Sequence, residues 1–399
     1  MTERLYLNDA YTTEFTARIV TIREKDGRPA VILDRTCFYP TSGGQLHDTG
    51  LIHNIRILNV YEENDTVIHE LEKKIETPGE VTCTIDRARR FDHMQQHTGQ
   101  HILSQCLINT FNAETISSSL GQESSTIDIN RTQFSIDDAL RAEEEANNWI
   151  YKNVPVHILY PSDKELDAMP LRKRPPAGKR TRIVHIEGLD YSPCGGTHCS
   201  FTGETGIIKI TGWEKMRGNI RLEFYCGSRG LIDYQNKSLT VNALKQVLTT
   251  EESALHETVQ RLMAEHKESQ KKSAELSSRL NEYRAMELID RAERIEGIAV
   301  VVDIRESGTM QELQSSARSI RDKSTGIVLT AGAEDSTFVF TVSDGVNLNL
   351  QDILSTLRSD FEFKGGGGPT MVQGALQDKT GPEDFIAAAK RCIEEQLSS

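Results

Sequence analysis

The chain has 399 residues, and its 46 lysines and arginines stand against 59 aspartates and glutamates, so the formal net charge of -13 argues against non-specific coating of nucleic acid. No run of about 18 apolar residues is present, which excludes a transmembrane helix, and seven cysteines, an odd number, argue against a disulfide framework. Because the start of the chain has no apolar signal segment, we expect a cytoplasmic protein with two or three folded domains.

Residues 1–85 are predicted to form a small β-barrel domain. Alternating β-branched residues predict strands at 14–24, 29–34, 52–61 and 81–85, and several short strands separated by glycine turns are typical of a closed barrel. Residues 38–45 include the adjacent glycines Gly43 and Gly44. This segment is either a plain turn or a loop that approaches a substrate closely and presents Thr41 and Gln45 to it.

Residues 86–230 change to an α+β pattern. Helical periodicity predicts helices at 91–111 and 137–152, and Ser135 with Asp138 three residues later suits the N-terminus of the second helix. Strands are predicted at 154–160, 182–187, 206–209 and 221–225.

Two short segments of this domain carry residues that bind metals. His97 and His101 are four residues apart, so they lie on one face of the predicted helix. Cys194 and His198 flank two glycines about a hundred residues later, and a thiolate with three imidazoles suits one zinc ion. His93 repeats the spacing, but it would lie about 12 Å along the axis from His101, so both cannot bind one ion. The distance alone does not show whether His93 or His101 is the ligand.

The zinc would be either catalytic or structural. A structural ion would have all four positions filled by protein, whereas a catalytic ion would polarise a carbonyl, lower the pKa of a water or position a substrate. Cys199 is an alternative ligand to Cys194, but it lies outside the glycine turn. The residue after His97 is Thr98, not the glutamate of the zinc-protease helix motif, so peptide hydrolysis by that mechanism is not expected.

A basic run precedes the second metal segment. Six lysines and arginines occur within residues 172–182. On its own such a run is more often a solvated loop than a nucleic-acid contact, but its position a dozen residues before Cys194 would place it beside the site.

Residues 231–296 are predicted to form a helical, coiled-coil-like stalk. They form either one long helix or a hairpin that turns near residues 267–272. Residues 297–399 are predicted to form an α/β module, with strands at 298–304, 326–330 and 337–342 and helices at 311–319, 350–358 and 383–396. Lys364 and the glycines at 365–368 follow its last strand, as either a flexible loop or a phosphate cradle.

Together these segments resemble the alanyl-tRNA editing proteins. The resemblance is carried by Tyr-Pro-x-Ser-Gly-Gly-Gln at 39–45, by residues 86–101 with both helix histidines, and by Cys-Gly-Gly-Thr-His at 194–198 followed by residues 202–210. Because the β-rich segment begins at Met1, with no room for an aminoacylation core, the chain is similar to the freestanding, long form of this family, AlaX. Its C-terminal module is similar to the DHH-associated RNA-binding subdomain, and its N-terminal barrel to those of translation factors.

The resemblance implies a deacylase that hydrolyses the ester of mischarged tRNA(Ala), chiefly seryl-tRNA(Ala) and, as a second substrate, glycyl-tRNA(Ala). It implies one zinc ion per chain held by His97, His101, Cys194 and His198, which leaves out His93. Such editing is useful because an apolar alanine pocket rejects serine only about 100-fold, so a second site must test for the hydroxyl. Thr41 and Gln45 are the first candidates for that test, and Gln100 is the third.

Contact with tRNA is expected from cations and from the two glycine segments. The residues are Gly43, Gly44, Arg89, Arg90, Arg172, Lys173, Arg174, Lys179, Arg180, Lys364, Gly365, Gly366, Gly367 and Gly368. A homodimer would form through the stalk or the C-terminal module, and no membrane contact is expected.

Three other functions remain open. Threonyl-tRNA-type editing shares the two metal segments, although the barrel and the C-terminal module argue against it. A non-catalytic zinc-containing tRNA-binding factor is a second alternative. A phosphodiesterase is a third, but no Asp-His-His segment precedes the C-terminal module.

Overall fold

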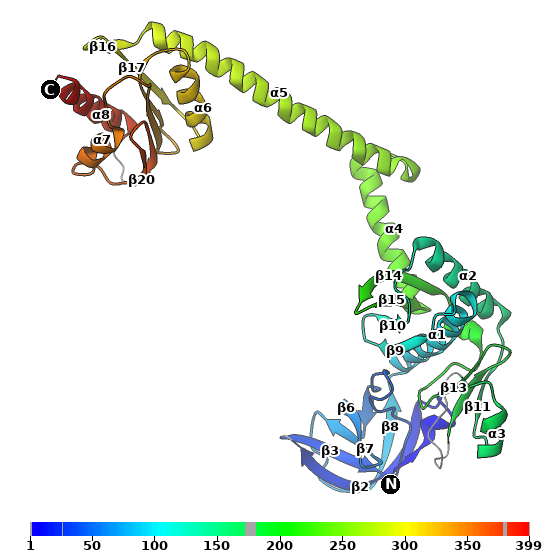
Figure 1. Ribbon diagram of the computed structural model, residues 1–399. Helices are drawn as coiled ribbons and strands as arrows, with labels where there is room; N and C mark the ends of the chain where they lie inside the picture. The colour runs from blue at the N-terminus through cyan, green and yellow to red at the C-terminus, as the bar shows by residue number, and fades with distance from the viewer. Residues whose placement is uncertain (1, 26, 172–180, 378–380, 399) are drawn as a thin grey trace. The chain divides into compact units, whose positions relative to one another are not determined.

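The computed structural model describes residues 2–25, 27–171, 181–377 and 381–398. The chain divides into two compact units, Met1–Val247, called unit 1, and Leu248–Ser399, called unit 2 (Figure 1). Both units combine sheets with helices, which confirms the prediction of a mixed α/β multidomain protein. In the part of the chain that is described, no helix has both the length and the apolar character needed to cross a bilayer.

A closed six-stranded barrel forms the first part of unit 1. Its strands, in barrel order, are β2 (Glu14–Lys25), β3 (Arg28–Leu33), β7 (Thr66–Leu71), β6 (Ile55–Glu63), β5 (Gly50–Ile52) and β8 (Glu80–Ile85). The short strands β1 (Glu3–Arg4) and β4 (Arg35–Thr36) pair beside it. Alternate residues of β2, including Ala17 and Ile19, are buried in the barrel core, as its sequence pattern requires.

Two details of the barrel differ from the sequence prediction. The single strand expected at 52–61 is two strands, because His53 and Asn54 form a two-residue hairpin with φ of 50° and 61°. Strand β7 was not predicted. Five of its six residues are buried, including His69 and Glu70, so its sequence lacks the alternation of a strand with one face in water.

The remainder of unit 1 surrounds helix α1 (Arg87–Phe111). A four-stranded sheet has the order β14, β15, β10, β9, and a three-stranded sheet has the order β11, β12, β13. The elements are β9 (Thr115–Leu120), β10 (Ser125–Ile129), α2 (Ile136–Lys152), β11 (Val156–Leu159), α3 (Asp163–Ala168), β12 (Ile183–Ile186), β13 (Asp190–Pro193), β14 (Ile208–Met216), β15 (Asn219–Cys226) and α4 (Ser228–Leu248).

Local signals set the ends of the two main helices. Asp86 caps α1 by accepting a hydrogen bond from the backbone N–H of Arg89, so the helix begins four residues before the predicted start at 91. Asn112 ends α1 with φ of 53°. The predicted cap of α2 is present as a capping box between Ser135 and Asp138.

The helical region after unit 1 breaks at a different place from the one considered in the sequence. Helix α4 ends at Leu248, a short 3-10 turn covers Glu252–Ala254, and α5 (Leu255–Asp290) continues without interruption through 267–272. Thr249 has φ of 48°, which ends the first helix. The polar residues at 267–272 are exposed, so they are compatible with an unbroken helix, and of the two alternatives a hairpin at 267–272 is not formed.

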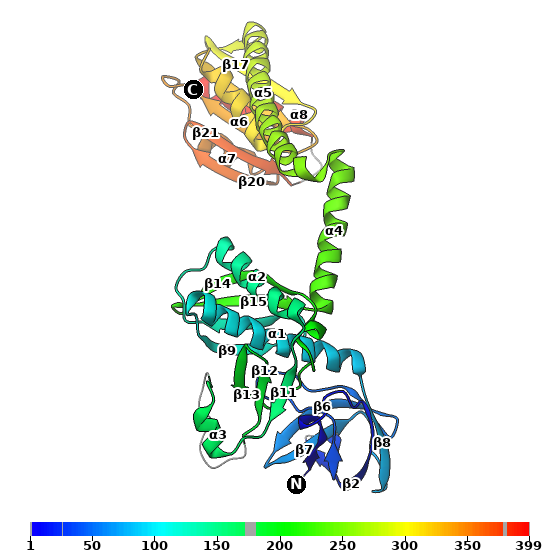
Figure 2. The same ribbon diagram turned by 90° about the vertical axis from the view of Figure 1, so that its right-hand side faces the viewer.

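Unit 2 contains a six-stranded sheet with helices on both faces (Figure 2). Its strand order is β16 (Glu293–Ile295), β17 (Ile298–Arg305), β18 (Gly326–Gly332), β19 (Thr337–Val342), β21 (Met371–Leu376) and β20 (Phe363–Gly368). The C-terminal part of α5 and α6 (Met310–Arg321) cover one face, with Val301, Val328 and Val339 beneath them. Helices α7 (Leu350–Leu357) and α8 (Pro382–Leu397) cover the other.

The glycine run of unit 2 is a strand and not the predicted loop. Residues 365–368 belong to β20, which pairs antiparallel with β21 at the edge of the sheet. A Cβ atom on Gly365 would lie 2.3 Å from the carbonyl oxygen of Gln373, and one on Gly367 would lie 2.2 Å from that of Met371. Two of the glycines are therefore required by the close approach of the two backbones.

Candidate metal centre

Four metal-binding side chains meet at one place in unit 1. His97 and His101 extend from α1, and Cys194 and His198 lie on the loop after β13, a strand that packs beside α1 (Figure 2). Their ligand atoms all lie within 4.8 Å of one another. The Cys194 Sγ atom is 3.3 Å from Nε2 of His97 and 3.3 Å from Nε2 of His198. Three imidazoles and a thiol at these distances can bind a metal ion.

Each imidazole is oriented by a hydrogen-bonding group behind it. The Nδ1 atom of His97 lies 2.8 Å from the Gln45 side-chain oxygen, and that of His101 lies 3.1 Å from the Asp190 carboxylate. Both oxygens accept hydrogen bonds, so each ring carries its proton on Nδ1 and leaves Nε2 with a lone pair toward the cluster. Nδ1 of His198 lies 3.4 Å from the Thr98 hydroxyl.

The glycine turn of the second segment fits against the first histidine. A Cβ atom on Gly196 would lie 2.1 Å from Cε1 of His97, so no side chain is possible there without moving the ring. The neighbouring Thr197 hydroxyl accepts a hydrogen bond from the Gln45 amide, and its backbone N–H donates to the Gln45 oxygen. Gln45 therefore fixes the loop and the imidazole at the same time.

Arg182, the last cation of the basic run, also holds this loop. Its guanidinium donates to the carbonyl oxygens of Cys194 at 2.7 Å and Gly196 at 3.0 Å, and also to that of Leu7. The side chain is largely buried, and burial lowers its pKa. It supports the cluster from behind and does not face solvent.

The pKa values of Cys194 and His198 favour metal binding. Burial alone would raise the pKa of the Cys194 thiol, but the nearby His97 and His198 outweigh it and hold that pKa well below its ordinary value. Burial lowers the pKa of His198 to about 3. Burial also acts to lower the pKa of His101, yet the hydrogen bond to Asp190 outweighs it and raises that pKa. A thiolate and a neutral imidazole are the forms that bind a metal.

His93 and Cys199 lie outside the cluster. His93 is buried on α1, where burial lowers its pKa to about 4. Cys199 is buried as well, and its pKa is raised to about 12, chiefly by burial. The two neighbouring cysteines therefore differ sharply: Cys194 is surrounded by imidazoles, whereas the Cys199 thiol is in a site that disfavours its ionisation.

Ligand pockets are typically about 300 to 1,000 Å³ in volume, and a cavity of 680 Å³ opens beside the cluster. Its wall includes three members of the cluster and several hydroxyl groups from β9 and β13. The lining residues are Gly43, His97, Gln100, His101, Ile108, Glu114, Thr115, Ile116, Ser117, Ser118, Ser192, Pro193 and Cys194.

The three candidates for sensing a substrate hydroxyl occupy different positions. Gln100 lines the cavity, and its amide donates to the Ser104 hydroxyl at 2.8 Å. Gln45 is fully buried behind His97. Thr41 is exposed, lies 3.0 Å from the His47 ring, and is not among the residues that line the cavity.

The first glycine segment contributes the cavity wall. Gly43 lines the cavity, with φ of 57°. Gly44 has φ of 82° and packs against β9, where a Cβ atom would lie 2.8 Å from the carbonyl oxygen of Ser118. The carbonyl oxygen of Gly44 accepts a hydrogen bond from the backbone of Leu120. The loop therefore joins the barrel to the second half of unit 1.

The predicted tRNA contact by Arg90 is wrong. Its side chain is 1% exposed and forms a buried ion pair with Asp48, while further N–H groups donate to the carbonyl oxygens of Ala10 and Cys37. A buried guanidinium needs such partners, and it has no surface left for a phosphate. Arg89, by contrast, is half-buried and donates to the carbonyl oxygen of His47.

The remaining predicted tRNA contacts lie outside the described residues or in unit 2. Arg172, Lys173, Arg174, Lys179 and Arg180 lie outside the described residues. Lys364 and Gly365–Gly368 lie in unit 2, on the exposed strand β20.

The sequence prediction missed the groups that orient the imidazoles. Asp190 and Thr98 lie close to predicted ligands in sequence, but neither carries a signal of its own. Asp190 is the first residue of β13, a strand that was not predicted. Metal-binding histidines usually donate their second ring N–H to an acceptor, so a search for carboxylates four residues before Cys194 would have found it.

Two protein families match parts of unit 1. Residues 181–223 match the family described as "Threonyl and Alanyl tRNA synthetase second additional domain", a segment that contains Asp190, Cys194 and His198. Residues 8–89 match the family described as "tRNA synthetases class II (A)".

Individual proteins match over much longer stretches. The chain is 30% identical over 407 residues to the alanyl-tRNA editing protein AlaX-L of Pyrococcus horikoshii, and the match covers 100% of both chains. It is 29% identical to the alanine-tRNA ligase of Pyrococcus abyssi and 33% identical to that of Methanoregula boonei, each over 98% of this chain. The chain spans only 43% and 44% of those two ligases.

One solved structure has a short match. The C-Ala domain from Aquifex aeolicus alanyl-tRNA synthetase covers 27% of this chain at 20% identity, with a TM-score of 0.24. A likeness at that score carries no argument about the fold.

Proposed function

The chain belongs to the family of alanyl-tRNA editing proteins, and from this premise we propose that it hydrolyses the aminoacyl ester of seryl-tRNA(Ala), with glycyl-tRNA(Ala) as a second substrate. The observation that carries the proposal is the cavity of 680 Å³, which brings hydroxyl and amide side chains beside the cluster of three imidazoles and one thiol. A site of this kind suits a small polar aminoacyl group, because its wall can form hydrogen bonds with a hydroxyl.

The cluster fits one zinc ion. His97, His101, Cys194 and His198 would hold it, because nitrogen and sulfur are the donors that zinc prefers and because each imidazole turns its Nε2 inward. When bound by all four residues, zinc would have no open fourth position, so it would hold the two segments together and position the substrate, and it would act as a Lewis acid on the ester carbonyl only by taking a fifth ligand.

The side chains of the chain itself perform three tasks in this proposal. Gln45 and Asp190 hold the imidazoles in one tautomer, so the cluster is organised before substrate enters. The cavity wall receives the aminoacyl group. Water then breaks the bond between the acyl carbon and the ribose oxygen, which releases the free amino acid and the tRNA with its terminal hydroxyl restored.

In this proposal the site distinguishes serine from alanine by a hydrogen bond to the serine hydroxyl. An apolar pocket rejects an added hydroxyl only about 100-fold, but a site that places a polar group to bind the hydroxyl penalises its absence much more strongly. Among the three candidates we favour Gln100, because it alone lines the cavity. Gln45 supports His97 instead, and Thr41 would need to act from outside the lining.

The tRNA is proposed to reach the cavity along cationic surfaces. Arg89 is one contact, and the basic residues at 172–180, which lie outside the described structure, would be another. In unit 2, Lys364 and the glycine strand would meet the body of the tRNA. We retain the four-part division into 1–85, 86–230, 231–296 and 297–399 as a functional proposal, with the first two parts forming the hydrolytic site.

The test is a deacylation assay with the full-length protein. Loss of the ester from seryl-, glycyl-, threonyl- and alanyl-tRNA is followed with and without a zinc chelator. We expect rapid loss from seryl-tRNA(Ala), slower loss from glycyl-tRNA(Ala), none from alanyl-tRNA(Ala), and inhibition by the chelator that added zinc reverses. Hydrolysis of threonyl-tRNA alone would instead indicate threonyl-type editing, and tRNA binding without hydrolysis of any ester would indicate a binding factor.

The hydroxyl-sensing assignment has its own variant. Gln100→Leu removes the hydrogen-bonding group, so we expect seryl-tRNA deacylation to fall about tenfold, the value of one lost hydrogen bond of about 1.4 kcal/mol. The glycyl-tRNA rate serves as the internal control, because glycine has no hydroxyl to bind. Equal losses on both substrates would assign Gln100 to packing.

A further inference from the structure

The cavity beside the metal cluster has one carboxylate in its wall, and the proposed hydrolysis does not yet use it. This carboxylate belongs to Glu114, which lies between the end of α1 and the start of β9. Among the described residues of the lining, Glu114 is the only acidic one, and none is a lysine or an arginine. The wall therefore offers a negative side chain with no neighbouring basic side chain to neutralise it.

The Glu114 carboxylate has no partner among the described residues. Its side chain is exposed and forms neither an ion pair nor a hydrogen bond with them. Exposure alone is ordinary for a glutamate. Glu114 differs from other exposed glutamates because its surface lies in the wall of the cavity that also contains His97, His101 and Cys194. A ligand in that cavity would meet the carboxylate.

The backbone of Glu114 is held in place although its side chain is free. Its N–H donates to the side-chain oxygen of Asn130 at 2.7 Å, and its carbonyl oxygen accepts from the backbone N–H of Asn130 at 3.1 Å. The next residue, Thr115, donates through its hydroxyl to Ser104 of α1, and Gln100 donates to the same oxygen. The position of Glu114 is therefore fixed relative to Gln100, and only its side-chain torsions remain to be ordered by a ligand.

An aminoacyl ester brings a cation into this cavity. Its α-amino group is charged below its pKa, and the ordinary pKa of an α-amino group is about 7.7–8.0. An ammonium group has three N–H donors and no acceptor, so a carboxylate is its strongest partner. The Cys194 thiolate is the other anionic group of the lining, but its Sγ atom already lies 3.3 Å from Nε2 of both His97 and His198. Glu114 is left to receive the ammonium.

We propose that Glu114 binds the α-ammonium group of the aminoacyl ester, so that the cavity prefers acyl groups with a free amine over those whose amine is missing or blocked. The carboxylate anchors one end of the acyl group, and the part of the cavity next to the cluster receives the ester. The identity of the ligand as an aminoacyl ester rests on the proposed function. A peptidyl ester has no α-ammonium group at this position, so the same contact favours aminoacyl-tRNA over peptidyl-tRNA.

The first experiment compares two esters of tRNA(Ala) that differ in the amino group alone. Seryl-tRNA and 3-hydroxypropanoyl-tRNA carry the same hydroxyl and the same kind of ester bond. With the full-length protein, Glu114→Gln should raise the KM for the seryl ester about three- to tenfold and leave the KM for the other ester unchanged. Each ester is compared with itself in the two proteins, so the different intrinsic reactivities of the two esters cancel.

A matched variant controls for the loss of a surface charge. Glu123 is an exposed glutamate in the turn between β9 and β10, and it does not line the cavity. Glu123→Gln should change neither KM. Because the Glu114 side chain has no partner among the described residues, Glu114→Gln should keep the wild-type melting temperature. If Glu114→Gln changes the KM for both esters equally, or for neither, Glu114 does not bind the ammonium.

A stable analogue separates this inference from the proposed activity. In 3′-seryl-amino-3′-deoxyadenosine an amide replaces the ester, and calorimetry compares its Kd with that of the 3-hydroxypropanoyl amide. Wild-type protein should bind the seryl amide about three- to tenfold more tightly, and Glu114→Gln should bind the two equally. This pattern without hydrolysis of any ester would support the ammonium site and contradict the hydrolase function. Equal binding of both amides by a wild type that hydrolyses seryl-tRNA would overturn the ammonium site alone, and the absence of both binding and hydrolysis would overturn both.

Discussion

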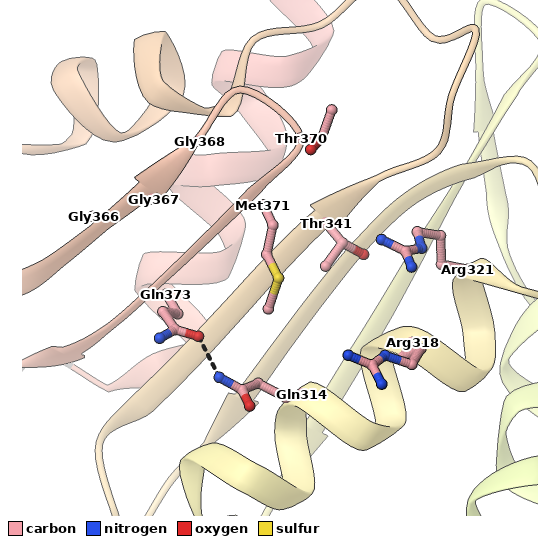
Figure 3. A pocket seen from close by; sticks show the side chains of 10 residues that line it. All are labelled: Gln314, Arg318, Arg321, Thr341, Gly366, Gly367, Gly368, Thr370, Met371 and Gln373. Carbon is pink, nitrogen blue, oxygen red and sulfur yellow. Dashed lines mark hydrogen bonds between the residues drawn. The ribbon is translucent and has the colours of Figure 1, made fainter.

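The metal cluster of unit 1 and the cavity of 550 Å³ that Arg318 and Thr341 line in unit 2 (Figure 3) hold their polar groups in opposite ways. At the cluster, each imidazole has a buried partner behind it, and Gln45 serves both His97 and the glycine turn. Among the described residues of unit 2, the exposed Arg318 has no such support and the buried Thr341 hydroxyl has no hydrogen-bond partner. The first arrangement fixes the geometry of its polar groups through neighbouring side chains, and the second does not.

Arg90 of unit 1 and Arg318 of unit 2 also differ in whether neighbouring groups hold the side chain. Arg90 is buried, paired with Asp48, and joins the barrel to α1, so its charge is part of the fold. Arg318 is exposed on the surface of α6, so its charge is available for binding. Residue type alone does not show whether an arginine is structural or available for binding. Its burial and its partners show this.

The largest expected effect removes a ligand of the cluster. Cys194→Ala takes away the only thiolate donor, so we expect the purified protein to retain no zinc and to deacylate seryl-tRNA(Ala) at least about 100-fold more slowly. Metal content by mass spectrometry and the deacylation rate are the measurements. The neighbouring Cys199→Ala is the matched control and should keep its zinc. If both variants retain metal equally, the cluster is not its binding site.

Breaking the buried ion pair should have the next largest effect. Asp48→Asn leaves the Arg90 guanidinium buried without a countercharge, so the free energy of unfolding should fall by about 3–5 kcal/mol. Urea denaturation measures it. Arg318→Gln changes an exposed arginine that has no ion pair among the described residues, so this free energy should change by less than about 0.5 kcal/mol. Similar losses in both variants would contradict the distinction between the two arginines.

Removing an orienting group should have a smaller effect than removing a ligand. Gln45→Leu leaves His97 in place but removes the acceptor for its Nδ1–H, so metal affinity should fall about 10- to 100-fold while some zinc remains bound. A competition titration against a chelator measures this. Thr41→Val, on the same loop but exposed, should leave the affinity unchanged. A Gln45 variant with the affinity of the wild type would show that the ring needs no such support.

The sequence predicted the ligands better than their surroundings. The four-residue spacing of His97 and His101 is a helical signal, and the glycine turn marks Cys194 and His198, so resemblance to the editing family could assign all four. Distance along a helix could exclude a joint role for His93 and His101 but could not choose between them. The orienting groups Asp190 and Thr98 depend on contacts between distant segments, which spacing cannot reveal.

Burial was the feature that sequence patterns missed most often. Arg89 and Arg90 were both predicted to contact tRNA, yet Arg90 is buried and Arg89 is half-buried. The glycine run was predicted as a loop, but its glycines are needed for close strand pairing at Gly365 and Gly367. Strand β7 was not predicted because it is buried on both faces, so its sequence does not alternate between apolar and polar residues.

A last prediction separates burial from metal binding. His69 lies in the barrel, is fully buried, and contacts the Thr36 hydroxyl at 3.0 Å, but it is not part of the cluster. Burial lowers its pKa from 6.5 to about 4 in the folded protein. Between those values the unfolded chain binds the proton and the folded chain does not, so this residue makes stability fall as the pH drops from about 6.5 to about 4. Above that window this residue costs no stability, and below it the loss of stability no longer grows.

His69→Gln should therefore reduce the dependence of unfolding free energy on pH by up to about 1.4 kcal/mol per pH unit within the window, measured by urea denaturation of the zinc-free protein. His53→Gln, an exposed histidine of the same barrel, should keep the wild-type slope. If the His69 variant also keeps it, burial in the barrel does not lower the pKa of this imidazole.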